Sequence, residues 1–263
     1  MAVSAYIKKL QSYEEYSFSL DEALAQVPRD ETAVKREIAR LVAKGEIINL
    51  RKGFYLIIPP RYAIAKKLPL PLYVNKLFKY LNRKYYVGLF SAAKMHGASH
   101  QQIQRDYIIT ETPKLISIKK KNIDILFFTT GNWPQQNIVL KKSDAGQYQV
   151  SSPALTFVDL IHHHSKTGGL NRTLATLEEL TEEITENDLI QLLQWYTNKS
   201  ALQRAGFLFE QFPKGEMLAD IIYNELKKTP YYPVLLSPRK NEKAGSARNR
   251  WKVDINQKLE SDL

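Results

Sequence analysis

Two arginines, Arg36 and Arg40, stand four residues apart in a segment whose apolar spacing predicts a helix from Asp30 to Lys44. Residues four apart share one face of a helix, and Thr32 falls on that face as well. The opposite face carries an apolar stripe of Val34, Ile38, Leu41 and Val42. Because guanidinium groups bond to phosphates and to guanine edges, this exposed face is suited to the major groove of DNA.

A second basic pair, Arg51 and Lys52, lies in a tight turn that ends at Gly53. The turn separates two runs of strand-forming residues, Glu46–Leu50 and Gly53–Ile58, and this arrangement predicts a β-hairpin. Basic side chains at a hairpin tip can reach the DNA backbone or minor groove beside a helix that occupies the major groove. We therefore expect the helix and the hairpin to contact the same DNA.

Two further helices are predicted upstream, one over Val3–Leu10 and one that begins after Ser19 and stops before Pro28. Three helices followed by a hairpin predict a winged helix-turn-helix over residues 1–60. The residues expected to contact DNA are Arg29, Thr32, Lys35, Arg36, Arg40, Arg51 and Lys52. Which of Thr32, Lys35, Arg36 and Arg40 read bases stays open, and winged helices also serve as protein–protein modules. Glu31 and Glu37 reduce the positive charge of the third helix.

The positive charge continues beyond the hairpin. The net charge is +11 at pH 7, and no Asp or Glu occurs between Ile47 and Arg105. Residues 61–84 are predicted to form a basic connector and a helix, and a field of this extent attracts polyanions. A possible secondary basic surface consists of Lys66, Lys67, Lys76, Lys79, Arg83 and Lys84.

Two other interpretations of this charge stay open. The basic region can be an ordinary solvated face, or it can dock an acidic protein partner such as a toxin, with the winged helix in a structural role. Nucleic acid is favoured over a membrane surface, because no strongly amphipathic basic helix carries Trp or Phe on its opposite face.

The remainder of the chain predicts a mixed architecture. Strand-like runs separated by turns fill residues 106–150, and helical spacing dominates from Ser152, an expected N-cap, to about Lys227. We predict an α+β fold, in which the N-terminal winged helix-turn-helix is followed by a C-terminal domain over residues 85–263 with mixed strands and then helices.

Histidine and cysteine offer no metal site. The chain has no cysteine, which excludes disulfides, thiolate-held zinc and a cysteine nucleophile. His96 and His100 are four apart, but Gly97 lies between them and no Glu follows the first histidine, as the zinc-binding helix motif requires. The side chains of the run His162–His164 point in three directions on a helix, so we interpret the run as a polar helix end.

The strongest enzyme alternative is a nuclease that uses Asp106, Glu111 and Lys114 to hold Mg²⁺ and activate water. Residues three apart on a strand face opposite sides, and Pro113 interrupts the segment, so Glu111 and Lys114 do not converge. The chain also lacks the glycine-rich loops that cradle phosphates. We predict no catalytic residue, no metal, no cofactor and no enzymatic activity.

The N-terminus, residues 1–20, lacks the continuous apolar core of a signal peptide, and no apolar run of about 18 residues occurs in the chain. The expected location is therefore the cytoplasm, without membrane partners.

Several phrases, in order along most of the chain, resemble the AbiEi-type antitoxins. The hairpin phrase at 51–56 is similar to the wing of that family, and the phrase at 85–97 is similar to its YYxGLxSAaxxHG signature. Three later phrases, at 152–160, 203–210 and 251–256, continue the likeness.

This resemblance implies an antitoxin of a type IV, abortive-infection toxin–antitoxin pair. It implies that the winged helix represses transcription by binding double-stranded DNA at the chain's own promoter. It also implies that the C-terminal domain counteracts a nucleotidyltransferase-like toxin, without a stable complex. The expected function is thus an autorepressor and antitoxin involved in phage defence.

Overall fold

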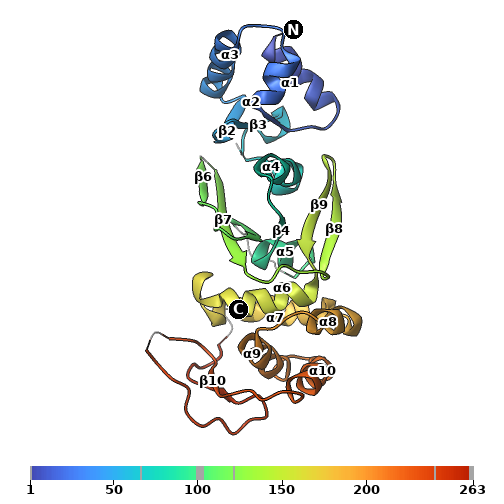
Figure 1. Cartoon of the computed structure of the whole chain (residues 1–263), viewed down its shortest axis with the longest axis vertical. Coiled ribbons are helices and arrows are strands. Elements are labelled where there is room, and N and C mark those ends of the chain that lie inside the picture. The colour runs from blue at the N-terminus through green and yellow to red at the C-terminus, as the bar shows by residue number, and fades with distance from the viewer. Residues whose placement is uncertain (1, 66, 99–103, 121, 240, 261–263) are drawn as a thin grey trace. The chain divides into compact units, whose positions relative to one another are not determined.

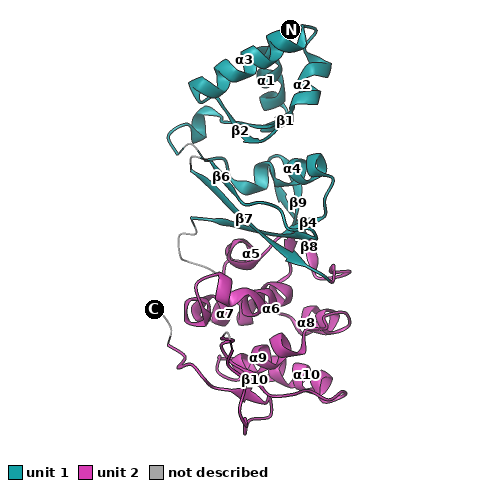
Figure 2. Ribbon diagram, turned by 60° about the vertical axis from the view of Figure 1, so that its left-hand side comes forward, with its two compact units in different colours: residues 1–86, 104–131, 140–149 teal, residues 87–103, 132–139, 150–263 magenta. Residues whose placement is uncertain are grey.

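A computed structural model describes residues 2–65, 67–98, 104–120, 122–239 and 241–260. The chain forms two compact units, coloured separately in Figure 2. Unit 1 comprises Met1–Tyr86, Gln104–Gly131 and Leu140–Gln149, and unit 2 comprises Val87–Ile103, Asn132–Val139 and Val150–Leu263. The predicted domain boundaries, 1–60, 61–84 and 85–263, stay predictions.

Unit 1 begins with three helices and a small antiparallel sheet (Figure 1). The helices are α1 (Val3–Ser12), α2 (Leu20–Gln26) and α3 (Glu31–Lys44). The strands are β1 (Ser17–Ser19), β2 (Ile47–Arg51) and β3 (Phe54–Ile57), in the order β1-β3-β2. Val34, Ile38 and Leu41 of α3 are buried in a core shared with α1 and α2, because they form the apolar stripe of that helix.

Local sequence signals account for the ends of these helices. Ser19 and Glu22 form a reciprocal capping box at the start of α2. The Asp30 carboxylate accepts hydrogen bonds from two backbone N–H groups at the start of α3, and Gly45 ends that helix with a left-handed φ of 76°. Strand β1 is not among the predicted elements, because three residues are too short to show an alternating pattern.

Unit 1 also contains most of a six-stranded sheet in the order β6-β7-β5-β4-β9-β8. Its strands are β4 (Tyr85–Val87), β5 (Asp106–Glu111), β6 (Ile118–Lys120), β7 (Ile123–Thr130), β8 (Ile138–Ser143) and β9 (Gly146–Ser151). Strands β5 and β7 are parallel, whereas β6 pairs with β7 in antiparallel orientation. Helix α4 (Val74–Leu81) places Phe78 against Tyr85 and Phe127, which fixes the helix on one face of the sheet.

Unit 2 is mainly helical. Its helices are α5 (Leu89–Met95), α6 (Pro153–His163), α7 (Leu170–Glu183), α8 (Glu186–Leu193), α9 (Lys199–Phe209) and α10 (Glu216–Leu226). Ser152 caps α6 and Pro153 occupies its first turn, as the sequence predicts. Phe157 of α6 stacks on Phe209 of α9 with ring centroids 4.1 Å apart, and two short strands, β10 (Val234–Leu235) and β11 (Val253–Asp254), pair in parallel near the C-terminus.

The mixed α+β class that the sequence predicts is confirmed. The three helices and the hairpin also lie where the periodicity predicts them. Among the described residues, none of the helices combines the length and the apolar character that spanning a membrane requires.

Candidate nucleic-acid interface

The exposed face of α3 carries Thr32, Arg36 and Arg40, and all three side chains are exposed. Residues Val34 and Ile38, on the other face, are essentially inaccessible to solvent. The helix is therefore anchored through its apolar stripe, and its polar face is free to meet a partner.

The two acidic residues of α3 are already paired with basic neighbours. The Glu31 carboxylate lies 2.5 Å from the Lys35 ammonium, and the Glu37 carboxylate lies 3.5 Å from the Arg29 guanidinium. Within the described residues, neither Arg36 nor Arg40 has an ion-pair or hydrogen-bond partner. The unpaired charge of this face is thus concentrated on two guanidinium groups, the groups best suited to phosphate and guanine.

A shallow groove of about 560 Å³ runs beside this face. It is lined by Ser4, Arg29, Ala33, Arg36, Glu37, Arg40, Leu41 and Lys44. Four of these residues are basic and one is acidic, so the groove adds to an electropositive surface along α3.

The two basic residues of the hairpin tip have different surroundings. Lys52 is exposed, whereas Arg51 turns inward and donates a hydrogen bond of 2.5 Å to the Ile116 carbonyl. The Arg51 guanidinium also lies 5.5 Å from the centre of the Phe127 ring, and burial lowers its pKa from the ordinary value. Arg51 therefore holds the hairpin against the six-stranded sheet, and Lys52 remains available to a partner.

Tyr80 of α4 fixes the other side of the same turn. Its hydroxyl donates a 2.9 Å hydrogen bond to the Lys52 carbonyl, and its ring packs 5.2 Å from that of Phe54. Gly53 adopts a left-handed φ of 76°, and an added Cβ there would press on the Tyr80 hydroxyl. These contacts of Tyr80 therefore hold the hairpin tip in place within unit 1.

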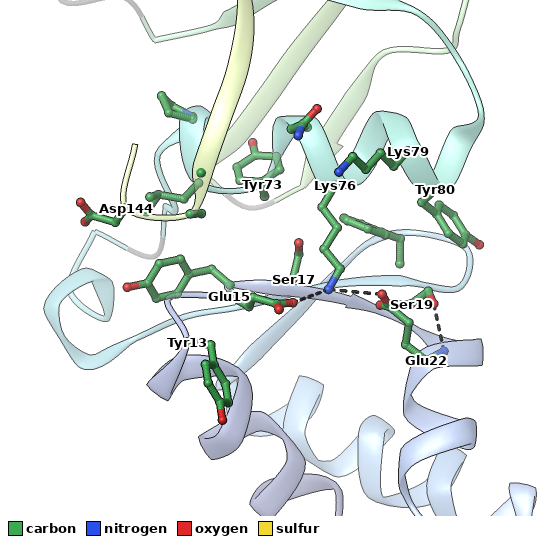
Figure 3. Close-up of a pocket in the computed structure, with 17 residues that line it drawn as sticks. Tyr13, Glu15, Ser17, Ser19, Glu22, Tyr73, Lys76, Lys79, Tyr80 and Asp144 are labelled. Atoms are coloured by element: carbon green, nitrogen blue, oxygen red, sulfur yellow. Dashed lines mark hydrogen bonds and ion pairs between the residues drawn. The ribbon is translucent and has the colours of Figure 1, made fainter. Parts of the chain in front are cut away.

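Half of the possible secondary basic surface is neutralised inside unit 1. Lys76 lies 2.7 Å from Glu15 and 3.3 Å from Glu22, as Figure 3 shows. Lys67 lies 3.6 Å from Asp106. Acidic residues distant in sequence therefore compensate a stretch that has none of its own.

Arg83 is compensated in the same way, since it lies 3.4 Å from the Glu111 carboxylate and donates to the backbone carbonyls of Glu111 and Pro113. Lys79 and Lys84 are exposed and their ammonium groups have no partner among the described residues. Lys66 lies outside the described residues. In the possible secondary basic surface, Lys79 and Lys84 are therefore the residues whose charges stay unpaired within the described part of the chain.

The pocket that Lys76 lines has a volume of about 810 Å³ and lies between the N-terminal helices and α4 (Figure 3). Its walls carry aromatic side chains, including Tyr16 and Tyr80, together with the paired charges of Glu15, Glu22 and Lys76. Within the pocket, the Lys76 ammonium thus pairs with the carboxylates of both Glu15 and Glu22.

Residues considered for catalysis do not converge. Asp106 and Glu111 stand at opposite ends of β5, which puts their backbones about 17 Å apart at 3.3 Å per residue. Each carboxylate pairs with a basic side chain, and the Lys114 ammonium lies 6.0 Å from the centre of the Phe128 ring. Among the described residues, no group of three or more His, Asp or Glu side chains could hold a metal ion.

The histidines serve local structure. His96 shares a 2.7 Å hydrogen bond with the Ser151 carbonyl, and His100 lies outside the described residues. The run His162–His164 does fall at the end of α6, but His163 and His164 are buried, which a polar helix end does not predict. His164 Nδ1 contacts the Ile161 carbonyl at 2.7 Å, and its Nε2 is buried without a partner among the described residues.

Acid is therefore expected to destabilise unit 2. Burial of the ring, foremost, lowers the pKa of His164 from the ordinary 6.5, and desolvation together with the nearby Lys166 lowers that of the more exposed His162. As the pH falls below 6.5, these imidazoles take up protons in the unfolded chain but stay neutral in the native state. The free energy of unfolding therefore decreases until the pH reaches the lower pKa values of the folded protein. Thermal unfolding from pH 7.5 to 5.5 checks this, and His164→Asn should remove part of the pH dependence. An identical pH dependence in both proteins would count against it.

Two exposed lysines outside the predicted set, Lys119 and Lys120, lie on β6 near the hairpin. The sequence does carry a signal for them, the lysine run that begins at residue 119. This run lies beyond the acid-free stretch, so the charge pattern alone does not connect it to the hairpin.

Residues 86–211, just under half of the chain, match the model of the AbiEi antitoxin C-terminal domain. This match supports the resemblance to AbiEi-like antitoxins that the sequence phrases indicate. A comparison with curated proteins finds no match.

One solved structure has a similar fold over nearly the whole chain. The RV2827C protein from Mycobacterium tuberculosis is 16% identical, with a TM-score of 0.62, and the match covers 95% of this chain and 89% of that chain. An antigenic nucleotidyltransferase-like protein from Paracoccidioides brasiliensis is 9% identical, with a TM-score of 0.36 over 57% of this chain and 88% of that chain. At 16% identity, the likeness to the RV2827C protein shows a shared fold.

Proposed function

We propose that this chain, AbiEi-like over residues 86–211, is a DNA-binding transcriptional autorepressor and the antitoxin of a type IV, abortive-infection pair. The match of that segment to an antitoxin domain carries the antitoxin half of the proposal. The proposed role is non-catalytic, since the protein acts by occupying DNA and by counteracting a toxin.

The repressor half rests on the surface of α3. In this proposal α1–α3 and the β2–β3 hairpin form a winged helix-turn-helix, and α3 enters the major groove of the chain's own promoter. Arg36 and Arg40 contact bases or phosphates, with Thr32, Lys35 and Arg29 around them. The observation that supports this assignment is that both guanidinium groups are exposed and unpaired among the described residues, while the neighbouring acids are neutralised. Lys52 contacts the backbone, and Arg51 positions the hairpin.

The antitoxin half belongs to the segment that matches the family. There the partner is a nucleotidyltransferase-like toxin, counteracted without a stable complex. The alternative, a protein-interaction module that docks an acidic partner through its basic middle region, is less favoured. Lys67, Lys76 and Arg83 of that region are already paired with acidic residues of the same unit.

Fluorescence anisotropy with the DNA upstream of the gene, against scrambled DNA, tests the repressor half. At about 0.15 M salt we expect the upstream duplex to bind at least about 10³-fold more tightly, the lower range for specific readers. Equal and weak binding of both duplexes would overturn operator reading and favour the protein-interaction alternative. Co-expression with a neighbouring nucleotidyltransferase gene tests the antitoxin half, with restored growth as the expected result.

A further inference from the structure

Strand β6 is one edge of the six-stranded sheet, and it carries Lys119 and Lys120. Both side chains are exposed, and neither has an ion-pair partner among the residues that the structure describes. Asp124 pairs with Lys119 in the strand register, but its carboxylate lies 2.8 Å from Arg105. The edge therefore carries positive charge that the described part of the fold does not neutralise.

The two lysines lie on opposite faces of the sheet. Residues directly opposite in an antiparallel pair share a face, so Lys120 shares the face of Ile123 and Lys119 that of Asp124. Because side chains alternate along β7, Phe127 lies on the same face as Ile123. Arg51 stacks on Phe127, and Lys120 thus belongs to the face that holds the hairpin.

The hairpin and β6 form one continuous surface. Strands β2 and β6 lie against each other, and Arg51 bonds to Ile116, four residues before Lys120. Because four residues of extended chain span roughly 13 Å, Lys120 lies within about that distance of Ile116, to which Arg51 is bonded. In both Figure 1 and Figure 2, α3, β2 and β6 follow one another along the same side of unit 1.

We propose that Lys52 and Lys120 form a phosphate-contacting strip that extends the DNA footprint of α3 along the duplex backbone. This inference rests on the proposed function, since it assigns a second contact surface to the same DNA. An ammonium group on a flexible stem is a point charge that suits phosphates rather than base edges. The strip therefore contributes affinity and orientation, while α3 contributes sequence preference.

Acidic groups near this face do not cancel the strip. Asp106 of β5 pairs with Ile125 of β7, which places it on the hairpin face, and its carboxylate lies 3.6 Å from the Lys67 ammonium. Lys52 and Lys120 thus keep their charge for a partner.

The test is a salt titration of DNA binding with the full chain. The log–log slope of affinity against salt falls by about 0.9 for each phosphate that the protein no longer neutralises. We expect Lys52→Ala and Lys120→Ala each to lower the slope by this amount, and the double variant to lower it by about twice as much. Upstream and scrambled DNA should weaken alike, so their affinity ratio should stay constant.

Lys119→Ala is the matched control, because it removes the same charge one residue away on the other face of the sheet. Its slope should equal that of the unmodified protein. If Lys120→Ala and Lys119→Ala give the same slope, the strip is overturned, even where the preference for upstream DNA persists. Normal DNA binding of Lys120→Ala together with a failure to neutralise the toxin would also overturn it, because the strip would then serve a protein.

Failure of the proposed function has a different signature. If the unmodified protein binds upstream and scrambled DNA equally, operator reading fails, while the slopes on either duplex still support or overturn the strip. Circular dichroism and thermal unfolding of each variant should match the unmodified protein, since exposed and unpaired lysines contribute little to stability.

Discussion

Replacing both Arg36 and Arg40 by alanine is expected to abolish the preference for upstream DNA and to leave toxin neutralisation largely intact. Each guanidinium contact with a base or phosphate is worth about 1–3 kcal/mol, so the pair accounts for about 30-fold to 10⁴-fold in affinity. Both side chains are exposed and unpaired within the described residues, so their removal should change the free energy of unfolding by no more than about 0.5 kcal/mol.

Two assays check this expectation, anisotropy on upstream and scrambled duplexes and growth rescue in cells that express the toxin. Arg239→Ala with Arg248→Ala is a suitable control, because it removes the same charge from unit 2. The control should bind upstream DNA normally. Loss of both activities in the Arg36 and Arg40 variant, with unchanged circular dichroism, would contradict a division of labour between the two regions.

The sequence predicts α3 well because the signals that define it are local. Asp30 caps the helix, Gly45 ends it, and the apolar stripe that contains Val34 and Ile38 gives it one buried face. The hairpin is predicted to within a residue for the same reason, since Gly53 closes a short turn between two apolar runs.

Strands held by distant partners are harder to predict. Ser17–Ser19 forms β1 only because it pairs with Phe54–Leu56. Val87, at the end of β4, pairs with Val150. Three-residue strands are too short to show a period of two, so their existence depends on tertiary contacts that no local pattern reveals.

In the candidate site, too, some features follow from local sequence signals and others depend on distant contacts. The exposure of Arg36 and Arg40 follows from helical periodicity, whereas the inward turn of Arg51 depends on Ile116 and Phe127, far along the chain. Charge behaves in the same way, because an acid-free stretch in sequence acquires acidic partners such as Glu15 once the chain folds. A charge run in sequence is therefore an upper limit on the free charge of the surface.

A large loss of stability is expected when Gly206 or Trp251 of unit 2 is replaced. Trp251 is completely buried, and its six-membered ring lies where a Cβ on Gly206 would be, so the ring packs directly on the backbone of α9. Gln203, one turn earlier, donates a 2.7 Å hydrogen bond to the Trp251 carbonyl. Two of the phrases that resemble the antitoxin family, at 203–210 and 251–256, thus pack against each other.

Trp251→Ala is expected to lower the free energy of unfolding by about 3–5 kcal/mol, since it removes a large buried ring and leaves a cavity. Gly206→Ala should cost about 1–3 kcal/mol, because the new methyl group overlaps that ring. Urea unfolding measures both values. Toxin neutralisation should decline in the same order, because the C-terminal segment loses its anchor on α9.

Gly245→Ala separates this packing effect from a general intolerance of glycine replacement in unit 2. Gly245 is exposed, and an added Cβ would meet only the Asp254 carboxylate, at an ordinary van der Waals distance of 3.5 Å. This variant should therefore unfold and neutralise toxin like the unmodified protein. If Gly206→Ala leaves the unfolding midpoint unchanged while Gly245→Ala lowers it, Trp251 does not anchor the C-terminal segment. If upstream DNA binding falls together with neutralisation in Gly206→Ala, the two activities share one folding unit.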